Sequence, residues 1–372
     1  MRALVTFYPM PLPRDFAQPA VRRAWVRQIM APLDDSSWEH LARELFAWQF
    51  TRVPAYRRLC QAYEITPPRL KSWRDIPAAP QQLFKREKLF AHGSAHPAAI
   101  YETSGTTTGQ PGRQHLLKTD IYRATSVEGA KRAGLFKQTP QFHFLTPSPD
   151  EVPHSSLSAM FGFWQKALQQ TEPCFWLHQD NFDFTSLRER LLTQIKLPRP
   201  IAITGTAFSF VHLIDAWVDL PPLRLPRGSW LLETGGFKGR SREISKAELY
   251  AKLSRLFSIP DRSIWNEYGM SELSSQAYAR GTSGLHQTPP WARVLVCDPA
   301  TGREVRIGQR GLVRWLDLAN VDSVMALQTL DIAERTSHGF RLIGRLPRTE
   351  PRGCSLSIED LVLSSNSTPS SS

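Results

Sequence analysis

Apolar side chains recur at three- and four-residue spacing within the first hundred residues, which predicts a mainly helical region. The clearest patterns cover residues 25–29 and 38–50, and the polar run from Asp34 to Ser37 supplies an N-cap for the second helix. From residue 101 to about 290, short apolar runs alternate with helical patterns instead. Such alternation is typical of an α/β domain with a largely parallel sheet, whose ligands gather at the carboxyl ends of the strands.

Short apolar runs mark the expected strands. In the α/β region they cover residues 142–145, 200–204 and 230–234. After residue 290 strands follow one another without helical patterns, which predicts a small β subdomain with strands at residues 292–297, 311–316 and 339–343. Residues 201–220 are the most apolar stretch, but His212, Asp215 and Asp219 lie within it. We therefore expect a buried strand and an amphipathic helix there, and no membrane span.

The amino-acid composition narrows the expected cellular compartment and binding partners of the protein. The chain has 372 residues, of which 41% are hydrophobic and 22% charged, so a folded protein of one large or two smaller domains is expected. The formal charge of +12 is dispersed, without the concentrated basic face that nucleic-acid binding requires, so no nucleic acid is expected. The four cysteines are far apart and form no zinc motif, and the N-terminus makes a poor signal peptide. These features favour a cytoplasmic protein.

A loop rich in glycine and hydroxyl residues lies at residues 101–112. Backbone turns at its glycines would direct N–H and O–H donors into one concavity, which suits a phosphate group. The candidate residues are Thr103, Ser104, Gly105, Thr106, Thr107, Thr108 and Gly109. The spacing is not that of a Walker loop, and by composition alone a flexible surface loop is as good an interpretation.

Two further segments follow expected strands. Residues 233–239 contain Gly235, Gly236 and Lys238, and taken alone they indicate only a strand-to-helix turn. Residues 266–272 read Asn-Glu-Tyr-Gly-Met-Ser-Glu. Taken alone, the terminal Glu272 could be an acid favoured by a helix dipole.

Together these segments resemble the adenylate-forming superfamily of acyl-CoA synthetases, luciferase-type ligases and peptide-synthetase adenylation domains. In that superfamily the equivalent of Tyr268 provides an aromatic face for adenine, that of Ser271 a hydroxyl for the α-phosphate, and that of Glu272 a carboxylate for Mg²⁺. The resemblance also places Gly235, Gly236 and Gly269 among the residues that bind the cofactor. The resemblance continues at residues 327–331, where it implies that Asp331 binds the ribose of ATP, and at Gly344-Arg345, which matches the start of the hinge to a small C-terminal domain. The implied cofactors are ATP and Mg²⁺.

Within the superfamily, the amino-acid sequences of residues 146–158, 233–239 and 266–273 resemble those of the LuxE-type acyl-protein synthetases. The similarity extends over roughly residues 70–360. This resemblance implies that a carboxylic acid, with a fatty acid expected, is adenylated and then transferred to a cysteine as a thioester. An acyl-accepting protein, either a reductase or an acyl carrier protein, would then take the acyl group. The resemblance identifies Cys354 as the acylated residue, and neighbouring arginines would favour its thiolate.

The chain also departs from the superfamily pattern. Gln110 replaces a common lysine of the phosphate loop, and the small C-terminal domain with its adenylation lysine is expected to be truncated. Lys238 and Arg345 are the candidates for supplying the missing positive charge. The domain organisation that follows is an adenylate-forming core at residues 1–340, a stub at 341–363 that carries Cys354, and a disordered tail at 364–372.

Two alternatives stay open. The same adenylating site could deliver the acyl group directly to CoA or to a carrier protein's phosphopantetheine, with Cys354 structural. The substitution at Gln110 and the absent lysine would also suit a non-catalytic module that binds a nucleotide or an acyl group.

Overall fold

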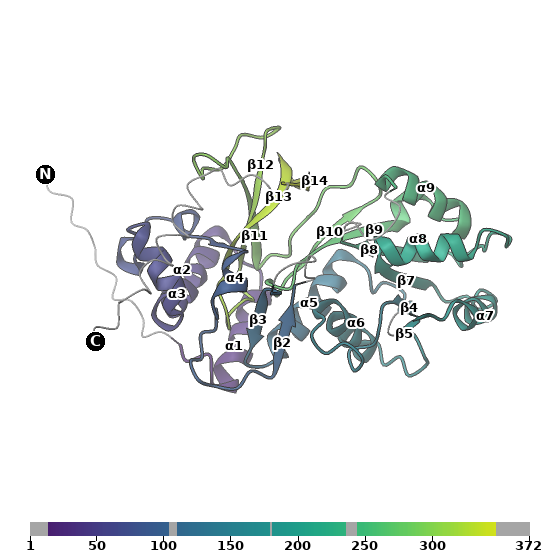
Figure 1. Cartoon of the computed structure of the whole chain (residues 1–372), viewed down its shortest axis with the longest axis horizontal. Coiled ribbons are helices and arrows are strands. Elements are labelled where there is room, and N and C mark those ends of the chain that lie inside the picture. The colour runs from purple at the N-terminus through teal and green to yellow at the C-terminus, as the bar shows by residue number, and fades with distance from the viewer. Residues whose placement is uncertain (1–13, 104–109, 179–180, 236–243, 347–372) are drawn as a thin grey trace, which may run out of the picture.

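The computed structural model describes residues 14–103, 110–178, 181–235 and 244–346. Two five-stranded sheets carry most of its β structure. Helices α2 (Asp35–Arg52) and α3 (Pro54–Ala62) lie at one end of the molecule in Figure 1, and helices α7 (Phe184–Gln194), α8 (Ala207–Ala216) and α9 (Lys246–Phe257) lie at the other. The architecture is α/β with helices flanking the sheets, as the sequence pattern predicts.

The N-terminal helices are held to one of the sheets by large aromatic side chains. Helix α1 (Pro19–Met30) buries Trp25 and α2 buries Trp38, in the same core cluster as Trp315 of the sheet. The indole N–H of Trp25 also donates a 2.8 Å hydrogen bond to the carbonyl of Leu318. Each fully buried large apolar side chain contributes about 1.5–3 kcal/mol, so this interface fixes the helices firmly. Three short helices follow: η1 (Pro67–Arg69), η2 (Trp73–Asp75) and α4 (Leu83–Arg86).

The predicted cap of α2 is confirmed, because the Asp34 carboxylate accepts a 2.8 Å hydrogen bond from the backbone N–H of Ser37. Replacing Asp34 with Ala removes this acceptor, so we expect the free energy of unfolding to fall by about 1 kcal/mol in urea denaturation. Asp34→Asn keeps a good capping oxygen and should stay close to wild type. Equal loss in both variants would show that charge, not capping, explains the effect.

The first sheet has the strand order β10-β9-β8-β7-β4. Its strands are β4 (Gln141–Leu145), β7 (Ile201–Thr206), β8 (Trp230–Thr234), β9 (Ile264–Tyr268) and β10 (Ala277–Arg280). Strands β4, β7, β8 and β9 are parallel, and β10 is antiparallel to β9. Helices α5 (Asp120–Ala133) and α6 (Ser156–Ala167) pack on one face, and α7 to α9 pack on the other. The three strands predicted in the α/β region are confirmed as β4, β7 and β8. The prediction of a strand followed by a helix in residues 201–220 is also confirmed.

The second sheet has the order β1-β13-β12-β11, and β14 pairs with β13. Its strands are β1 (Ala79–Pro80), β11 (Ala292–Cys297), β12 (Arg310–Asp317), β13 (Ala326–Thr336) and β14 (Gly339–Arg345). The three strands expected after residue 290 are therefore present as β11, β12 and β14. Short hairpins are formed by β2 (Ala99–Glu102) with β3 (Arg113–Leu116), and by β5 (Leu177–His178) with β6 (Asn181–Phe182). Among the described helices, none is both long and apolar enough to cross a membrane.

Candidate active site

The glycine- and hydroxyl-rich loop connects the two strands of the β2–β3 hairpin. Its stem is closed by two hydrogen bonds: the Thr103 N–H donates to the Gly112 carbonyl, and the Gly112 N–H donates to Thr103 Oγ1, both at 2.9 Å. The predicted phosphate-binding residues Ser104, Gly105, Thr106, Thr107, Thr108 and Gly109 lie outside the described residues. The structure thus places the two ends of this loop and ties them together.

Ser271 links the segment after β9 to this stem. Its hydroxyl donates a 2.9 Å hydrogen bond to the carbonyl of Glu102, the last residue of β2. The hydroxyl of Ser156, the first residue of α6, lies 3.3 Å from the same Ser271 oxygen. Two segments whose contacting residues are 169 positions apart in the sequence therefore meet at Ser271.

Tyr268, Asp331 and Arg345 form a second group. Tyr268 ends β9, and its hydroxyl donates a 2.7 Å hydrogen bond to Asp331 Oδ2. Asp331 pairs with Arg345 in the register of β13 and β14, and the Arg345 guanidinium lies 3.6 Å from Asp331 Oδ1. Burial and the neighbouring Asp331 carboxylate raise the pKa of Tyr268 well above its usual value, so its hydroxyl stays a donor. The sequence singles out all three residues, and the fold brings them into contact.

The ring of Tyr268 is wedged among other aromatic rings. It packs edge-on against His286 and Phe340, with ring centroids 6.0 and 5.8 Å away, and it is tilted against Trp315. These contacts leave the Tyr268 residue only 9% exposed. The ring that the resemblance predicts to face adenine is therefore enclosed by other aromatic side chains of the protein.

Glu272 follows closely on the same segment and is 3% exposed. Its backbone carbonyl accepts a 2.8 Å hydrogen bond from the side chain of Asn320, which fixes the chain at this point. In the part of the chain that the structure describes, no group of three or more His, Cys, Asp or Glu side chains could hold a metal ion. A single carboxylate suits Mg²⁺ that is coordinated mostly by phosphate oxygens and water.

Two glycines shape the ends of β8 and β9. Gly235 has φ of +73°, in the left-handed region that favours glycine, and it turns the chain directly after β8. A Cβ on Gly269 would meet Glu267 Oε1, so a larger residue here would require the Glu267 side chain to move. Gly236 and Lys238 lie outside the described residues, and so does Cys354.

A family model described as "Acyl-protein synthetase, LuxE" matches residues 40–362 of this chain. The chain belongs to this family. The match includes every segment that converges on Ser271 and Tyr268.

Two ligases resemble this LuxE-family chain over most of their length. The long-chain-fatty-acid--luciferin-component ligase of Aliivibrio fischeri is 21% identical over 340 residues, which cover 87% of this chain and 88% of that protein. The protein of the same name from Vibrio harveyi is 19% identical over 344 residues, covering 88% of each. Among solved structures, a 2-hydroxyisobutyryl-CoA ligase in the postadenylation state superposes with a TM-score of 0.65 at 17% identity, covering 84% of this chain and 68% of that one. The fold of this chain is that of the adenylate-forming ligases.

Sequence reasoning missed two buried carboxyl groups in this LuxE-family chain, Glu233 of β8 and Glu267 of β9. Burial raises the pKa of each to about 7. Glu233 accepts hydrogen bonds from Tyr250 at 3.1 Å and Asn266 at 2.6 Å, whereas Glu267 accepts one from Thr234. The sequence pattern that could have indicated them is a glutamate next to the last residue of a short, mostly apolar strand.

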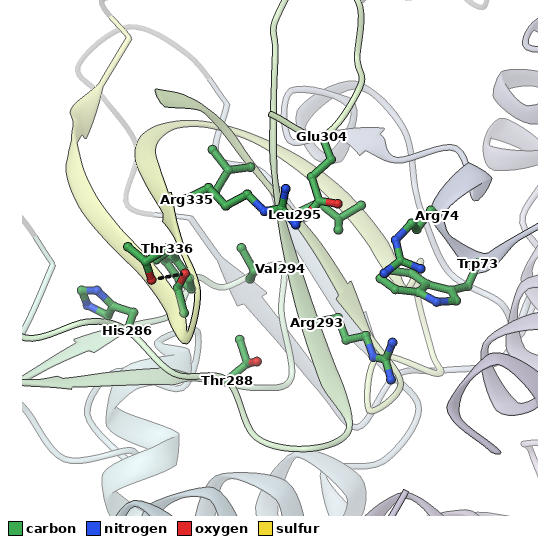
Figure 2. Close-up of a pocket in the computed structure, with 13 residues that line it drawn as sticks. Trp73, Arg74, His286, Thr288, Arg293, Val294, Leu295, Glu304, Arg335 and Thr336 are labelled. Carbon is green, nitrogen blue, oxygen red and sulfur yellow. Dashed lines mark hydrogen bonds and ion pairs between the residues drawn. The ribbon is translucent and has the colours of Figure 1, made fainter. Parts of the chain in front are cut away.

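A cavity of about 290 Å³ lies beside this site (Figure 2). Its walls come from β11, the β13–β14 turn and η2, and they carry Arg74, Arg293, Arg335 and Glu304. None of the described site residues named above lines it. Among its described lining residues, His286 and Phe340 also pack against Tyr268.

Proposed function

We propose that this LuxE-family chain uses ATP to convert a carboxylic acid, with a fatty acid as the expected class, into an acyl-adenylate and then transfers the acyl group to a thiol. The observation that carries this proposal is the convergence of the β2–β3 loop stem, the Tyr268–Glu272 segment and Asp331 around the ends of β8 and β9. Parallel α/β sheets bind their ligands at these strand ends. The family match and the adenylate-forming fold support the same chemistry.

The nucleoside end of ATP would bind at Tyr268 and Asp331. The Tyr268 hydroxyl holds Asp331 Oδ2, and the carboxylate keeps acceptor capacity for the ribose hydroxyls. Arg345, 3.6 Å from the other carboxylate oxygen, prevents Asp331 from being left as an isolated buried charge. Arg345 would also offset negative charge near the reacting phosphate.

The α-phosphate would lie beside Ser271 and the loop of residues 104–109, and Lys238 is the second proposed cation there. Glu272 would hold Mg²⁺, since Mg²⁺ prefers one or two carboxylates together with phosphate oxygens. The metal ion, when bound, neutralises charge on the phosphate oxygens. Catalysis of this kind depends on positioning and electrostatics more than on covalent help from the protein.

The reaction proceeds in two steps. First, a carboxylate oxygen of the acid attacks the α-phosphorus, and the bond to pyrophosphate breaks, which gives acyl-AMP. Second, the Cys354 thiolate attacks the acyl carbon, and AMP leaves with the bonding electrons, so that a thioester forms on the enzyme. An acyl-accepting protein, either a reductase or an acyl carrier protein, would then receive the acyl group from Cys354.

The two steps can be tested separately. Wild-type protein should exchange labelled pyrophosphate into ATP only when a carboxylic acid is present, and intact mass should detect a covalent acyl adduct. Cys354→Ala should abolish the adduct and leave exchange within about twofold of wild type, because the residue acts after adenylation. Cys174→Ala is the matched control and should keep the adduct, since burial raises the pKa of the Cys174 thiol to about 12 and makes it unreactive.

Each other result identifies a different alternative. An adduct that persists in Cys354→Ala would remove this cysteine from the mechanism. Thioester formation on CoA or on a carrier protein's phosphopantetheine by Cys354→Ala would show direct transfer from the adenylate. Binding of ATP without exchange, across fatty and aryl acids of all lengths, would show a non-catalytic binding module.

A further inference from the structure

Glu267 is a buried carboxyl group that the proposed adenylation does not use. The residue is 5% exposed, and the Thr234 hydroxyl is its one hydrogen-bond partner among the described residues. A carboxyl group offers about four lone-pair positions, of which the described residues use one. Glu267 Oε1 occupies the space where a Cβ on Gly269 would lie, which places this oxygen directly against the Tyr268–Ser271 segment.

Two more polar groups without partners lie on the same face of the sheet. Tyr278 is directly opposite Glu267 in the antiparallel register of β9 and β10, so both side chains point to one face. Its hydroxyl is buried and finds no hydrogen-bond partner in the described part of the chain, and the same holds for the hydroxyl of Thr204 on β7. Buried polar groups are almost always hydrogen-bonded, so these two hydroxyl groups are candidates for contact with a polar group of a ligand.

This face leads to the proposed reaction centre. Helix α5 covers it with Tyr122, whose pKa is raised by burial, by Tyr101 and by the nearby Glu267. The Tyr122 hydroxyl donates a 2.9 Å hydrogen bond to the carbonyl of Ser156, and Ser156 Oγ lies 3.3 Å from Ser271 Oγ. A short series of contacts thus connects Glu267 with the residue proposed to bind the α-phosphate.

The chemistry of these groups suits a neutral hydroxyl ligand. Burial, together with the charge of Glu233, raises the pKa of Glu267 to about 7, so below that pH its protonated form donates as well as accepts. Burial and Glu267 also raise the pKa of Tyr278, which therefore stays a phenol. An unsubstituted alkyl chain at this place would leave the carboxyl and phenol groups unpaired, which costs binding free energy.

We propose that Glu267 and Tyr278 select an acyl substrate that carries a hydroxyl group on carbon 2 or carbon 3, close to the reacting carboxylate. This inference rests on the proposed adenylation at Ser271. Because Glu267 Oε1 lies against Gly269, two residues before Ser271, a carboxylate bound beside Ser271 would bring the first carbons of its acyl chain toward Glu267 and Tyr278. The hydroxyl group is recognised by hydrogen bonds, and no bond to it forms or breaks.

The test compares three ten-carbon acids in pyrophosphate exchange: decanoate, 2-hydroxydecanoate and 3-hydroxydecanoate. Wild type should use one of the hydroxy acids with kcat/KM at least about tenfold above decanoate. Tyr278→Phe removes only a hydroxyl group without a partner, so the fold is retained and kcat/KM for the preferred hydroxy acid should fall about tenfold while that for decanoate is unchanged.

Three variants test which side chains cause the preference for a hydroxy acid. Glu267→Met should lose it, and Glu267→Gln, which still donates and accepts, should keep most of it. Glu189→Gln, on the exposed surface of α7, is the control and should keep the wild-type ratio. This inference alone is overturned if wild type exchanges without preference for either hydroxy acid. It is also overturned if the preference is unchanged in Tyr278→Phe and Glu267→Met. Absence of exchange with every acid overturns the proposed function and this inference with it.

Discussion

Glu272→Gln is expected to lower acid-dependent pyrophosphate exchange by about 10²–10³-fold, the usual loss when a charged group that stabilises a transition state is neutralised. The substitution keeps the volume of the side chain and removes its negative charge. The apparent affinity for Mg²⁺ should fall with the rate, since the carboxylate is the proposed metal ligand. The measurement is the exchange rate as a function of Mg²⁺ concentration, and a high concentration should restore part of the rate.

A general loss of structure must be separated from this effect, because Glu272 is 3% exposed. Thermal unfolding of Glu272→Gln should remain cooperative. Glu189→Gln is the matched control, on the exposed surface of α7, and it should behave as wild type in exchange and in unfolding. If Glu272→Gln keeps full exchange activity and the same dependence on Mg²⁺, this carboxylate is not a ligand of the proposed metal ion.

Arg22→Met is expected to lower the free energy of unfolding by about 3–5 kcal/mol, because it leaves a buried carboxylate without its main cation. The Arg22 side chain is fully buried and donates a 2.6 Å hydrogen bond to Asp322 and a 2.9 Å hydrogen bond to Asp120. His92 lies 2.7 Å from the same Asp322 oxygen. The cluster joins α1 to the segment between β12 and β13, and denaturation in urea would measure its contribution.

The pH dependence of stability gives an independent measure of the same cluster. Burial raises the pKa of Asp322, but hydrogen bonds from His92 and Arg22 outweigh burial and hold it below its usual value. This stabilisation is therefore present above the ordinary pKa of aspartate and is lost as pH falls through the lower folded value. In Arg22→Met the loss should begin at a higher pH. Arg23→Ala, an exposed neighbour, should change stability by less than about 0.5 kcal/mol, and an equal effect of both variants would refute a specific role of the buried pair.

Local patterns were sufficient to predict several elements of the fold. The strands β4, β7 and β8 were readable because each is a short apolar run buried on both faces, as central parallel strands are. The cap of α2 was readable because Asp34 acts on a residue only three positions away. The site segments around Tyr268 and Asp331 were identified by resemblance, and their role in binding ATP stays a prediction.

Pairing between distant segments could not be predicted in the same way. Strand β13 carries Asp331 but is lined alternately by buried and partly exposed residues, and only its pairing with β1, β12 and β14 makes it the centre of a sheet. The contact between Tyr268 and Asp331 depends on how the two sheets lie against each other. Arg22 carries no local signal of its burial, because a single charged residue is usually solvent-exposed.

The hydrogen bond from Ser271 to the carbonyl of Glu102 has a consequence for the biosynthesis of the protein. It joins residues 169 positions apart, and Asp331 and Arg345 are added to the growing chain later still. Contacts of such long sequence separation form late in folding. A nascent chain on the ribosome therefore lacks the Asp331–Arg345 pair of the proposed site until Arg345 has emerged. After dilution from denaturant, exchange activity should return with the slowest folding phase.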